Sequence, residues 1–265
     1  MNTSRHSDGC TPLCVAVEKR HTKVVKLLLA DKADVNASRH TDGVTPLYNA
    51  AENGQTEVVK LLLDNNVDVN VSRHTCGATP LCIASENGHT EVVKLLLVNN
   101  ADVNASRHTD AVAPLYTAAE NGHTEVVKLL LARKTDVNAS RHTGATPLYI
   151  AAHKGHTEVV KLLLANQAVV NAIIHIDGAT PLYAAAQNGH AEVVKLLLAN
   201  NADVNASRHT DGATPLYIAT CNGHTELVQL LLANTADVNA ARGDGDMPID
   251  AARRHHHLEI VELLQ

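Results

Sequence analysis

The most regular hydrophobic pattern in the chain is the hexapeptide Val-Val-Lys-Leu-Leu-Leu. It occurs unchanged six times, at residues 24–29, 58–63, 92–97, 126–131, 159–164 and 193–198. In each copy a lysine is the single polar residue among apolar ones. This pattern predicts a short helix whose apolar stripe is wider than one packing face requires. We therefore expect each of these helices to be buried between neighbours on two sides.

A second helix pattern precedes each hexapeptide. At Thr45-Pro46-Leu47 a helix is predicted to start, because threonine is a favoured N-cap and proline is tolerated at the first helical position. Gly54 suits the left-handed turn that would end this helix. The helix carries small residues, Ala50 and Ala51, which allow neighbouring backbones to approach closely. Segments such as 101–110 contain few apolar residues and predict an exposed, hairpin-like finger.

Both patterns recur at a fixed period along the chain. All eight prolines occupy the same position of the repeat, with separations of 33 or 34 residues. Self-similarity at this period is typical of a stacked repeat array. Because no linker interrupts the pattern, we predict a single domain, residues 1–265, of eight repeats. Their first helices are expected to start at residues 11, 45, 79, 113, 146, 180, 214 and 247.

The repeat resembles the ankyrin repeat family. The family signature, Gly-x-Thr-Pro-Leu-His-x-Ala-Ala followed by Gly-His, is similar to residues 212–219 and to Gly223-His224. The usual histidine is replaced here by tyrosine, cysteine or aspartate, at Tyr48, Cys82 and Asp250 for example. The resemblance implies an all-α solenoid of helix-turn-helix repeats with hairpin-like fingers. It also implies that fingers and first helices line a concave surface.

The terminal repeats and the fourth repeat depart from the pattern. Arg20 and His256 stand where the internal repeats have the glycine between their helices. A terminal repeat needs a polar outer face, because nothing stacks on it, and the last repeat is predicted to be such a cap. In the fourth repeat, Ala111 replaces the finger glycine and Ala113 replaces the capping threonine. We predict a local weak point there.

Composition excludes several classes of protein. The chain has 265 residues, a formal net charge of −6, and five tyrosines with no phenylalanine or tryptophan. Mild acidity argues against a nucleic-acid binder. The apolar runs are too short for a membrane-spanning helix, and residues 1–20 do not resemble a signal peptide. Five cysteines without paired spacing indicate a reducing compartment, so we expect a cytoplasmic protein.

Seventeen histidines raise the question of a metal site. Most fall into a finger series, which starts at His6, and a helix-start series, which starts at His21. Stacked helices lie about 10 Å apart, whereas zinc–nitrogen bonds are about 2.0–2.1 Å, so equivalent histidines cannot share an ion. We predict no metal, no cofactor and no enzymatic activity. We expect the helix-start rings to accept hydrogen bonds at the helix N-termini, which would lower stability in acid.

Arginine and tyrosine also recur at fixed positions. One arginine lies in almost every finger, at residues 5, 39, 73, 107, 141 and 208. These arginines are either solvated and independent of one another, or an edge that binds an acidic protein or an anionic polymer. The tyrosines share one position, which favours packing between repeats over a cofactor site.

The absence of catalytic motifs favours a scaffold that binds a partner protein on the concave surface. The family's recognition positions are the finger residues before Thr-Pro-Leu and the two residues before the inter-helix glycine. In this sequence the candidates are Asp42, Val44, Glu52, Asn53, Glu86, Asn87, Glu120, Asn121, His153, Lys154, Gln187, Asn188, Cys221 and Asn222. The alternative is a structural or engineered consensus-like array without a natural ligand.

One finger is unusually apolar. Ile173, Ile174 and Ile176 replace Ser, Arg and a small polar residue of the sister fingers, and Val169 replaces an aspartate. These isoleucines are candidate contacts for a partner or for a second copy of an otherwise monomeric chain. In the alternative interpretation, Ile173 and Ile176 fold back onto neighbouring fingers and are not exposed.

Overall fold

A computed structural model describes residues 9–265 of the chain. Within this range there are sixteen helices and no strand, and the helices form eight pairs, one pair in each repeat. Contacts divide the chain into two compact units, an N-terminal unit, Met1–Asp136, and a C-terminal unit, Val137–Gln265. The all-α fold predicted from the sequence is confirmed, while the single domain stays a prediction.

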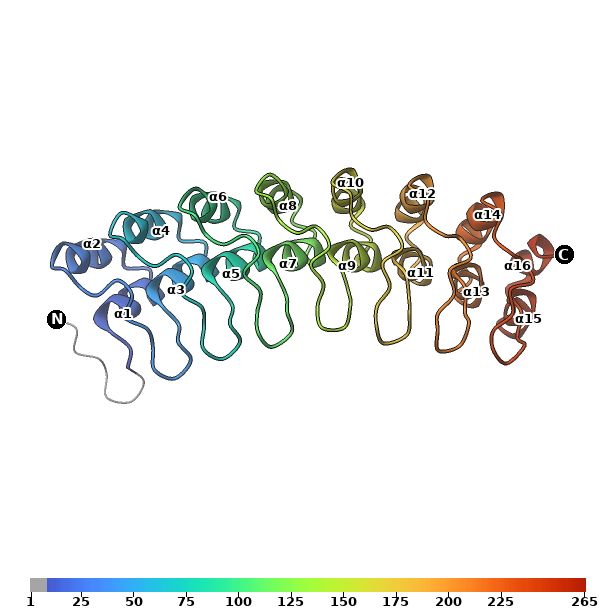
Figure 1. Ribbon diagram of the computed structural model, residues 1–265, viewed down its shortest axis with the longest axis horizontal. Coiled ribbons are helices and arrows are strands. Elements are labelled where there is room, and N and C mark those ends of the chain that lie inside the picture. The colour runs from blue at the N-terminus through green and yellow to red at the C-terminus, as the bar shows by residue number, and fades with distance from the viewer. Residues whose placement is uncertain (1–8) are drawn as a thin grey trace. The chain divides into compact units, whose positions relative to one another are not determined.

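Repeats one to four belong to the N-terminal unit. Its helices are α1 (Pro12–Glu18), α2 (Thr22–Ala30), α3 (Pro46–Glu52), α4 (Thr56–Leu63), α5 (Pro80–Glu86), α6 (Thr90–Val98), α7 (Pro114–Glu120) and α8 (Thr124–Leu131). The odd-numbered first helices form one row and the even-numbered second helices another, and the fingers extend from the row of first helices (Figure 1).

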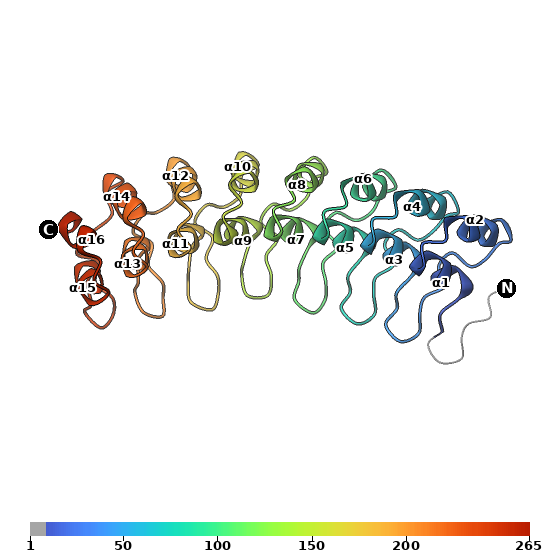
Figure 2. The same ribbon diagram turned by 180° about the vertical axis from the view of Figure 1, so that it is seen from behind.

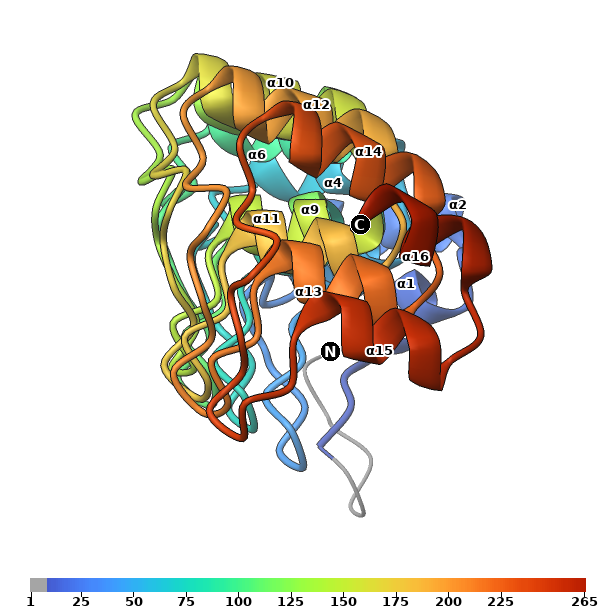
Figure 3. The same cartoon turned by 90° about the vertical axis from the view of Figure 1, so that its right-hand side faces the viewer.

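Repeats five to eight belong to the C-terminal unit. Its helices are α9 (Pro147–Lys154), α10 (Thr157–Ala165), α11 (Pro181–Gln187), α12 (Ala191–Ala199), α13 (Pro215–Cys221), α14 (Thr225–Ala233), α15 (Pro248–Arg254) and α16 (Leu258–Leu263). This unit also has a row of first helices and a row of second helices (Figure 2). Its fingers lie together on one side of the helix pairs (Figure 3).

The first helices begin where the sequence predicts. The Thr45 hydroxyl accepts a hydrogen bond from the backbone N–H of Tyr48 at 3.1 Å, and Pro46 occupies the first helical position. Ala50 and Ala51 are completely buried, which lets α3 pack closely against its neighbours. Small side chains at this interface therefore set the distance between repeats.

The second helices are buried on two sides in the internal repeats. Val58 and Leu62 of α4 are buried, as the wide apolar stripe predicts. In α2 the side that no repeat covers within the described residues leaves Val24 43% and Leu27 71% exposed. The comparison indicates that stacking, rather than the helix itself, buries this stripe.

Within each unit, two sets of hydrogen bonds to backbone atoms join neighbouring repeats. In the first set, an asparagine after a second helix accepts from a backbone N–H of the following repeat; Asn70, for example, accepts from Asp102 at 2.8 Å. In the fingers, the backbone N–H of His108 donates to the carbonyl of Cys76 at 3.0 Å. Both patterns recur in the two units, so neighbouring repeats keep one register.

Five helix-start histidines form a third set, in which their rings are donors: His89, His123, His190, His224 and His257. Nε2 of His123 lies 3.0 Å from the carbonyl oxygen of Glu86, and a carbonyl can only accept. The predicted acceptor role at the helix N-terminus is therefore wrong, since no such cap bond is made by His123. Because Nε2 carries a hydrogen in both protonation states, this bond does not require a neutral ring.

Each of these rings also lies against a glycine of the preceding repeat. A Cβ added to Gly88 would lie 2.6 Å from Nδ1 of His123, and the φ of Gly88 is +70°. In the first repeat this glycine is replaced by Arg20, with φ 59°. The next repeat has Gln55 in place of histidine, and its side-chain amide donates to the carbonyl of Val17 at 2.9 Å. The inter-helix glycine of one repeat and the helix-start histidine of the next therefore change together.

Restoring the fourth repeat to the pattern of its sisters should stabilise the protein. Ala111 has a φ of 60°, and Ala113 caps α7 without a side-chain hydrogen bond. The changes Ala111→Gly and Ala113→Thr should each raise the free energy of unfolding by about 1 kcal/mol, by relieving left-handed strain and by adding a cap. Urea unfolding measures this gain.

The control is Ala118→Gly, in the buried interior of the same helix. Glycine there should lower stability by about 1 kcal/mol or more. A fall in stability after Ala111→Gly would contradict the left-handed conformation at this position.

Candidate binding surface

The two residues before the inter-helix glycine lie at the end of each first helix. The side chain of the first of the two points outward. Glu52 is the last residue of α3 and is exposed, while Glu86 and Glu120 are half-buried. The Nη1 atom of Arg107 lies 3.4 Å from a carboxylate oxygen of Glu86. This position is therefore accessible at the surface of the N-terminal unit.

The asparagine directly before the inter-helix glycine also makes hydrogen bonds that stabilise the fold. The side-chain amide of Asn87 donates to the carbonyl of Glu52 at 3.0 Å, which links two repeats. Asn53 and Asn121 bond within their own repeats instead, each to a carbonyl of its first helix at 2.9 Å. These asparagines offer a partner only the part of the side chain that the stacking contacts leave exposed.

In the C-terminal unit the same position holds different chemistry. His153 is half-buried and Lys154 is exposed, and Gln187 and Asn188 are both exposed. The ring of His153 stacks on Tyr149, with the ring centroids 6.4 Å apart and the planes at 7°. The side chains offered to a partner thus change from acidic in one unit to basic and neutral in the other.

The candidates Cys221 and Asn222 end α13. Cys221 is half-buried, and this burial raises the pKa of its thiol. Asn222 is exposed and its amide donates to the carbonyl of Gln187 at 2.7 Å. The raised pKa keeps the Cys221 thiol protonated, which makes it a poor nucleophile.

The finger candidates Asp42 and Val44 stabilise the fold. Asp42 accepts from Nε and Nη2 of Arg39, at 2.8 and 2.5 Å, and from the backbone N–H of Val44 at 3.3 Å. Val44 is only 7% exposed and packs in a cluster with Tyr48. Val44 contributes to packing between repeats and offers little surface to a partner.

The finger arginines connect tyrosines and aspartates of neighbouring repeats. Arg208 donates to both carboxylate oxygens of Asp211, at 3.1 and 2.6 Å, and lies 5.0 Å above the ring of Tyr183 in the preceding repeat. A second carboxylate, that of Asp177, is 3.4 Å away. Such bidentate, stacked arginines are favourable because the guanidinium is planar and its charge is delocalised.

This arrangement answers the question that the sequence left open. Arg39, Arg73, Arg107 and Arg208 are neither independent nor free to bind an anion, because each is paired with a carboxylate; Arg5 lies outside the described residues. The tyrosine position is confirmed as a contact between repeats, seen again where Arg73 lies 5.9 Å from the ring of Tyr48. Sequence reasoning missed this stack, although arginine and tyrosine recur with the same period.

Electrostatic effects follow from these contacts. The hydrogen bond from Arg208 holds the pKa of Asp211 below its usual value, and Arg39 lowers the pKa of Asp42 in the same way. Burial raises the pKa of Tyr48 to about 12. The carboxylates are therefore ionised and the tyrosine neutral at physiological pH.

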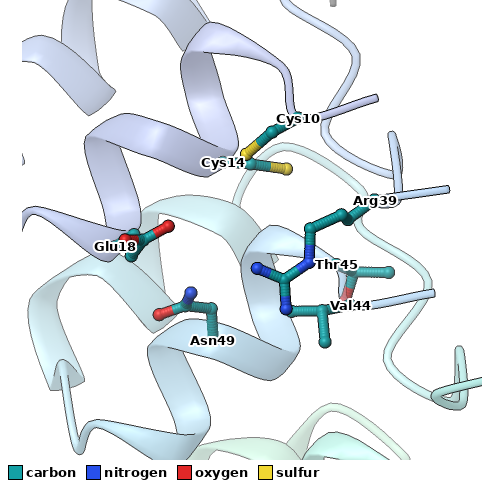
Figure 4. A pocket seen from close by; sticks show the side chains of 7 residues that line it. All are labelled: Cys10, Cys14, Glu18, Arg39, Val44, Thr45 and Asn49. Carbon is teal, nitrogen blue, oxygen red and sulfur yellow. The ribbon is translucent and has the colours of Figure 1, made fainter. Parts of the chain in front are cut away.

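Two repeats have cysteine in the tyrosine position. The thiol of Cys14 donates to the carbonyl of Ala37 at 3.4 Å, and that of Cys82 to Ala105 at 3.2 Å. Beside Cys14 the smaller side chain leaves a cavity of about 10 Å³ (Figure 4). Its lining residues are Cys10, Cys14, Glu18, Arg39, Val44, Thr45 and Asn49. Small-molecule sites are typically about 300–1,000 Å³, so this cavity is too small for one.

The apolar finger splits into a buried and an exposed part. Ile174 packs against the cluster that contains Tyr183, with Tyr149 beside it, in the position of the missing arginine. Ile173 is 41% and Ile176 71% exposed. The interpretation that Ile173 and Ile176 fold back and are covered is therefore wrong, and Ile174 is the isoleucine that packs.

Neither a cluster of metal ligands nor a membrane-spanning helix occurs within residues 9–265. No group of three or more histidine, cysteine, aspartate or glutamate side chains in this range is arranged to hold a metal ion. No helix of this range has the length and hydrophobicity needed to cross a membrane.

These features define a helical repeat protein in which pairs of short helices are joined by fingers. A family model described as ankyrin repeats in three copies matches residues 1–73, 31–107, 65–141, 115–208 and 205–265. The chain therefore belongs to the ankyrin repeat family. Members are generally protein–protein interaction modules and typically non-catalytic. No curated protein matches this chain significantly.

The Arg208 contact gives a quantitative prediction. Arg208→Lys removes the bidentate geometry and the stacking on Tyr183, so the free energy of unfolding should fall by about 1–2 kcal/mol at pH 7. Because the pKa of Asp211 is lowered in the folded state, its contribution is present above the unfolded value of about 3.9 and is lost as the pH falls below it. The difference between wild type and variant should therefore shrink in acid.

Urea unfolding at pH 7 and at about pH 3 measures both effects. Arg133→Lys is the control, because Arg133 is exposed and the substitution should change stability by less than about 0.5 kcal/mol. Equal losses for the two variants would contradict the proposed role of stacking.

Proposed function

We propose that this chain is a non-catalytic scaffold that binds a partner protein on the surface formed by the fingers and the ends of the first helices. One observation carries the proposal. The outward position before the inter-helix glycine varies, from Glu52 to His153, Gln187 and Cys221, while the positions that join the repeats stay nearly constant. Variation at accessible side chains on a regular framework favours recognition.

The structure does not support all the contact residues predicted from the sequence equally well. Glu52, Glu86 and Glu120 with their asparagines represent the N-terminal unit, and His153-Lys154 with Gln187 represents the C-terminal unit. Asp42 and Val44 are weaker candidates, because ion pairing and burial already engage them. We infer a partner protein rather than nucleic acid or a membrane, without a cofactor, and a cytoplasmic location.

The alternative function is a structural spacer or an engineered array without a natural ligand. The near identity of repeats two to four at the recognition positions supports it. Irregular segments such as Ala111-Val112-Ala113 support a natural sequence instead, because a deliberate design would not omit the glycine and the cap.

Partner capture separates the two functions. A variant with His153→Glu, Lys154→Asn, Gln187→Glu and Cys221→Glu gives the C-terminal unit side chains typical of the N-terminal unit. The control variant carries Lys161→Gln and Lys195→Gln on exposed positions of the second helices. In quantitative affinity capture, the proteins that bind the wild type should not bind the first variant and should still bind the control. Identical profiles for all three proteins would support the spacer function.

The exposed isoleucines are a separate candidate contact, for a partner or for a second copy of a chain that we propose to be monomeric. Ile173→Ser with Ile176→Thr should change stability by less than about 0.5 kcal/mol, because both side chains are exposed. Ile174→Ala should lower it by about 1 kcal/mol or more, because Ile174 packs against the cluster that contains Tyr183.

Sedimentation velocity over a range of concentrations, together with the capture assay, tests the contact. Loss of self-association or of a captured protein in the Ile173→Ser, Ile176→Thr variant supports it. Unchanged sedimentation and unchanged capture in that variant would reject the finger as a binding element.

A further inference from the structure

In the C-terminal unit, one contact between repeats has an acceptor that can be protonated. The amide of Asn87 donates to a backbone carbonyl of the preceding repeat at 3.0 Å, and that of Asn222 does so at 2.7 Å. At the equivalent position, the side-chain amide of Asn188 donates to the carbonyl of Ala184 in its own repeat at 2.8 Å, and its partner in the preceding repeat is Nδ1 of His153, 3.1 Å away. A backbone carbonyl accepts at any pH, whereas an imidazole nitrogen accepts only while it carries no proton.

His153 makes two further contacts, one through its ring and one through its backbone. The ring stacks nearly parallel on Tyr149, one turn earlier in α9. The backbone carbonyl of His153 accepts from Nε2 of His190 at 3.1 Å, so the second histidine lies against the same residue. Since Nδ1 accepts from Asn188, the neutral ring carries its hydrogen on Nε2.

The groups around the ring oppose its protonation. Lys154 is the neighbouring cation on α9, and His190 faces His153 from the start of α12. At the end of α11 the group in contact with the ring is the uncharged amide of Asn188. Burial, and then the charges of Lys154 and His190, hold the pKa of His153 below its usual value.

We propose that the neutral His153 ring is a pH-sensitive latch between repeats five and six, and that protonation of the ring releases it. A proton on Nδ1 replaces the acceptor with a second donor facing Asn188, and it adds a positive charge beside Lys154 and His190. The stabilisation is complete above the unfolded-state pKa of about 6.5 and is lost as the pH falls through that value.

The latch joins two residues of the proposed binding surface. His153 and Asn188 both occupy recognition positions. Acidification would break the contact between them, leave the Asn188 amide bonded to the carbonyl of Ala184, and turn a neutral ring into a cation at the same place. The inference itself does not depend on the proposed function, because it concerns a contact within the chain and can be tested without a partner.

Nuclear magnetic resonance of the imidazole nitrogens tests the latch in the unmodified chain. We expect His153 at pH 7.5 to be protonated on Nε2 and unprotonated on Nδ1, and its titration midpoint to be lower than in the urea-unfolded chain. In Asn188→Ala the midpoint should move to higher pH. A hydrogen on Nδ1 at pH 7.5, or a midpoint that Asn188→Ala leaves unchanged, would overturn the proposal.

The unfolding equilibrium provides the second readout. Between pH 7.5 and 5.5 the urea midpoint of the wild type should fall more than that of His153→Gln, whose side chain can still accept from Asn188 but does not titrate. His142→Gln, at an exposed histidine of the same unit, should keep the full wild-type loss. An equal loss in wild type and His153→Gln would also reject the latch. If a variant does not fold, the nuclear magnetic resonance titration of His153 in the unmodified chain tests the proposal alone.

Discussion

Hydrogen bonds that end on backbone atoms hold neighbouring repeats in register, and the packing within each unit depends on them. The asparagine after the second helix, the finger amide and the helix-start histidine each bond a backbone group of the adjacent repeat, as Asn70, His108 and His123 illustrate. A single pair of short helices cannot bury an apolar stripe as broad as that of α4, so its stability comes from its neighbours. Bonds to the backbone keep this stacking independent of most side-chain changes elsewhere in the repeat.

A second layer of contacts uses side chains and therefore varies along the chain. The stack of Arg208 on Tyr183, closed by Asp211, is the complete form of this layer. Where cysteine occupies the tyrosine position, a hydrogen bond from its thiol to a carbonyl replaces the stack. Where Ile174 occupies the arginine position, an apolar contact beside Tyr149 replaces it. Because the backbone bonds persist in each case, the repeats tolerate these changes. The same tolerance lets the outward position at His153 differ from its sisters and acquire chemistry that they lack.

Periodicity made the fold predictable, while the direction of individual side chains was not. Thr45 and Pro46 mark a helix start by local chemistry alone, and Ala111 was correctly placed at a left-handed position because its sisters are glycines. Tyr183, on which Arg208 stacks, and Glu86, whose carbonyl bonds the His123 ring, lie in another repeat, more than thirty residues away in the case of His123. No local pattern specifies such a contact, although a fixed period between two residue types is a signal for it. The candidate surface was predicted as positions, but the burial of Val44 and the split between Ile173 and Ile174 required coordinates.

The fit of each helix-start ring against a glycine has a consequence for how such a chain can be rearranged. A repeat that begins its second helix with histidine can follow any repeat that has glycine between its helices, so internal repeats are interchangeable modules. The first two repeats do not obey this rule, because the side chain of Arg20 stands where the histidine ring would lie, and Gln55 replaces that ring. Duplication, deletion or exchange among repeats three to seven should therefore preserve this junction, whereas a repeat placed directly after the first one should need a glutamine in place of the histidine.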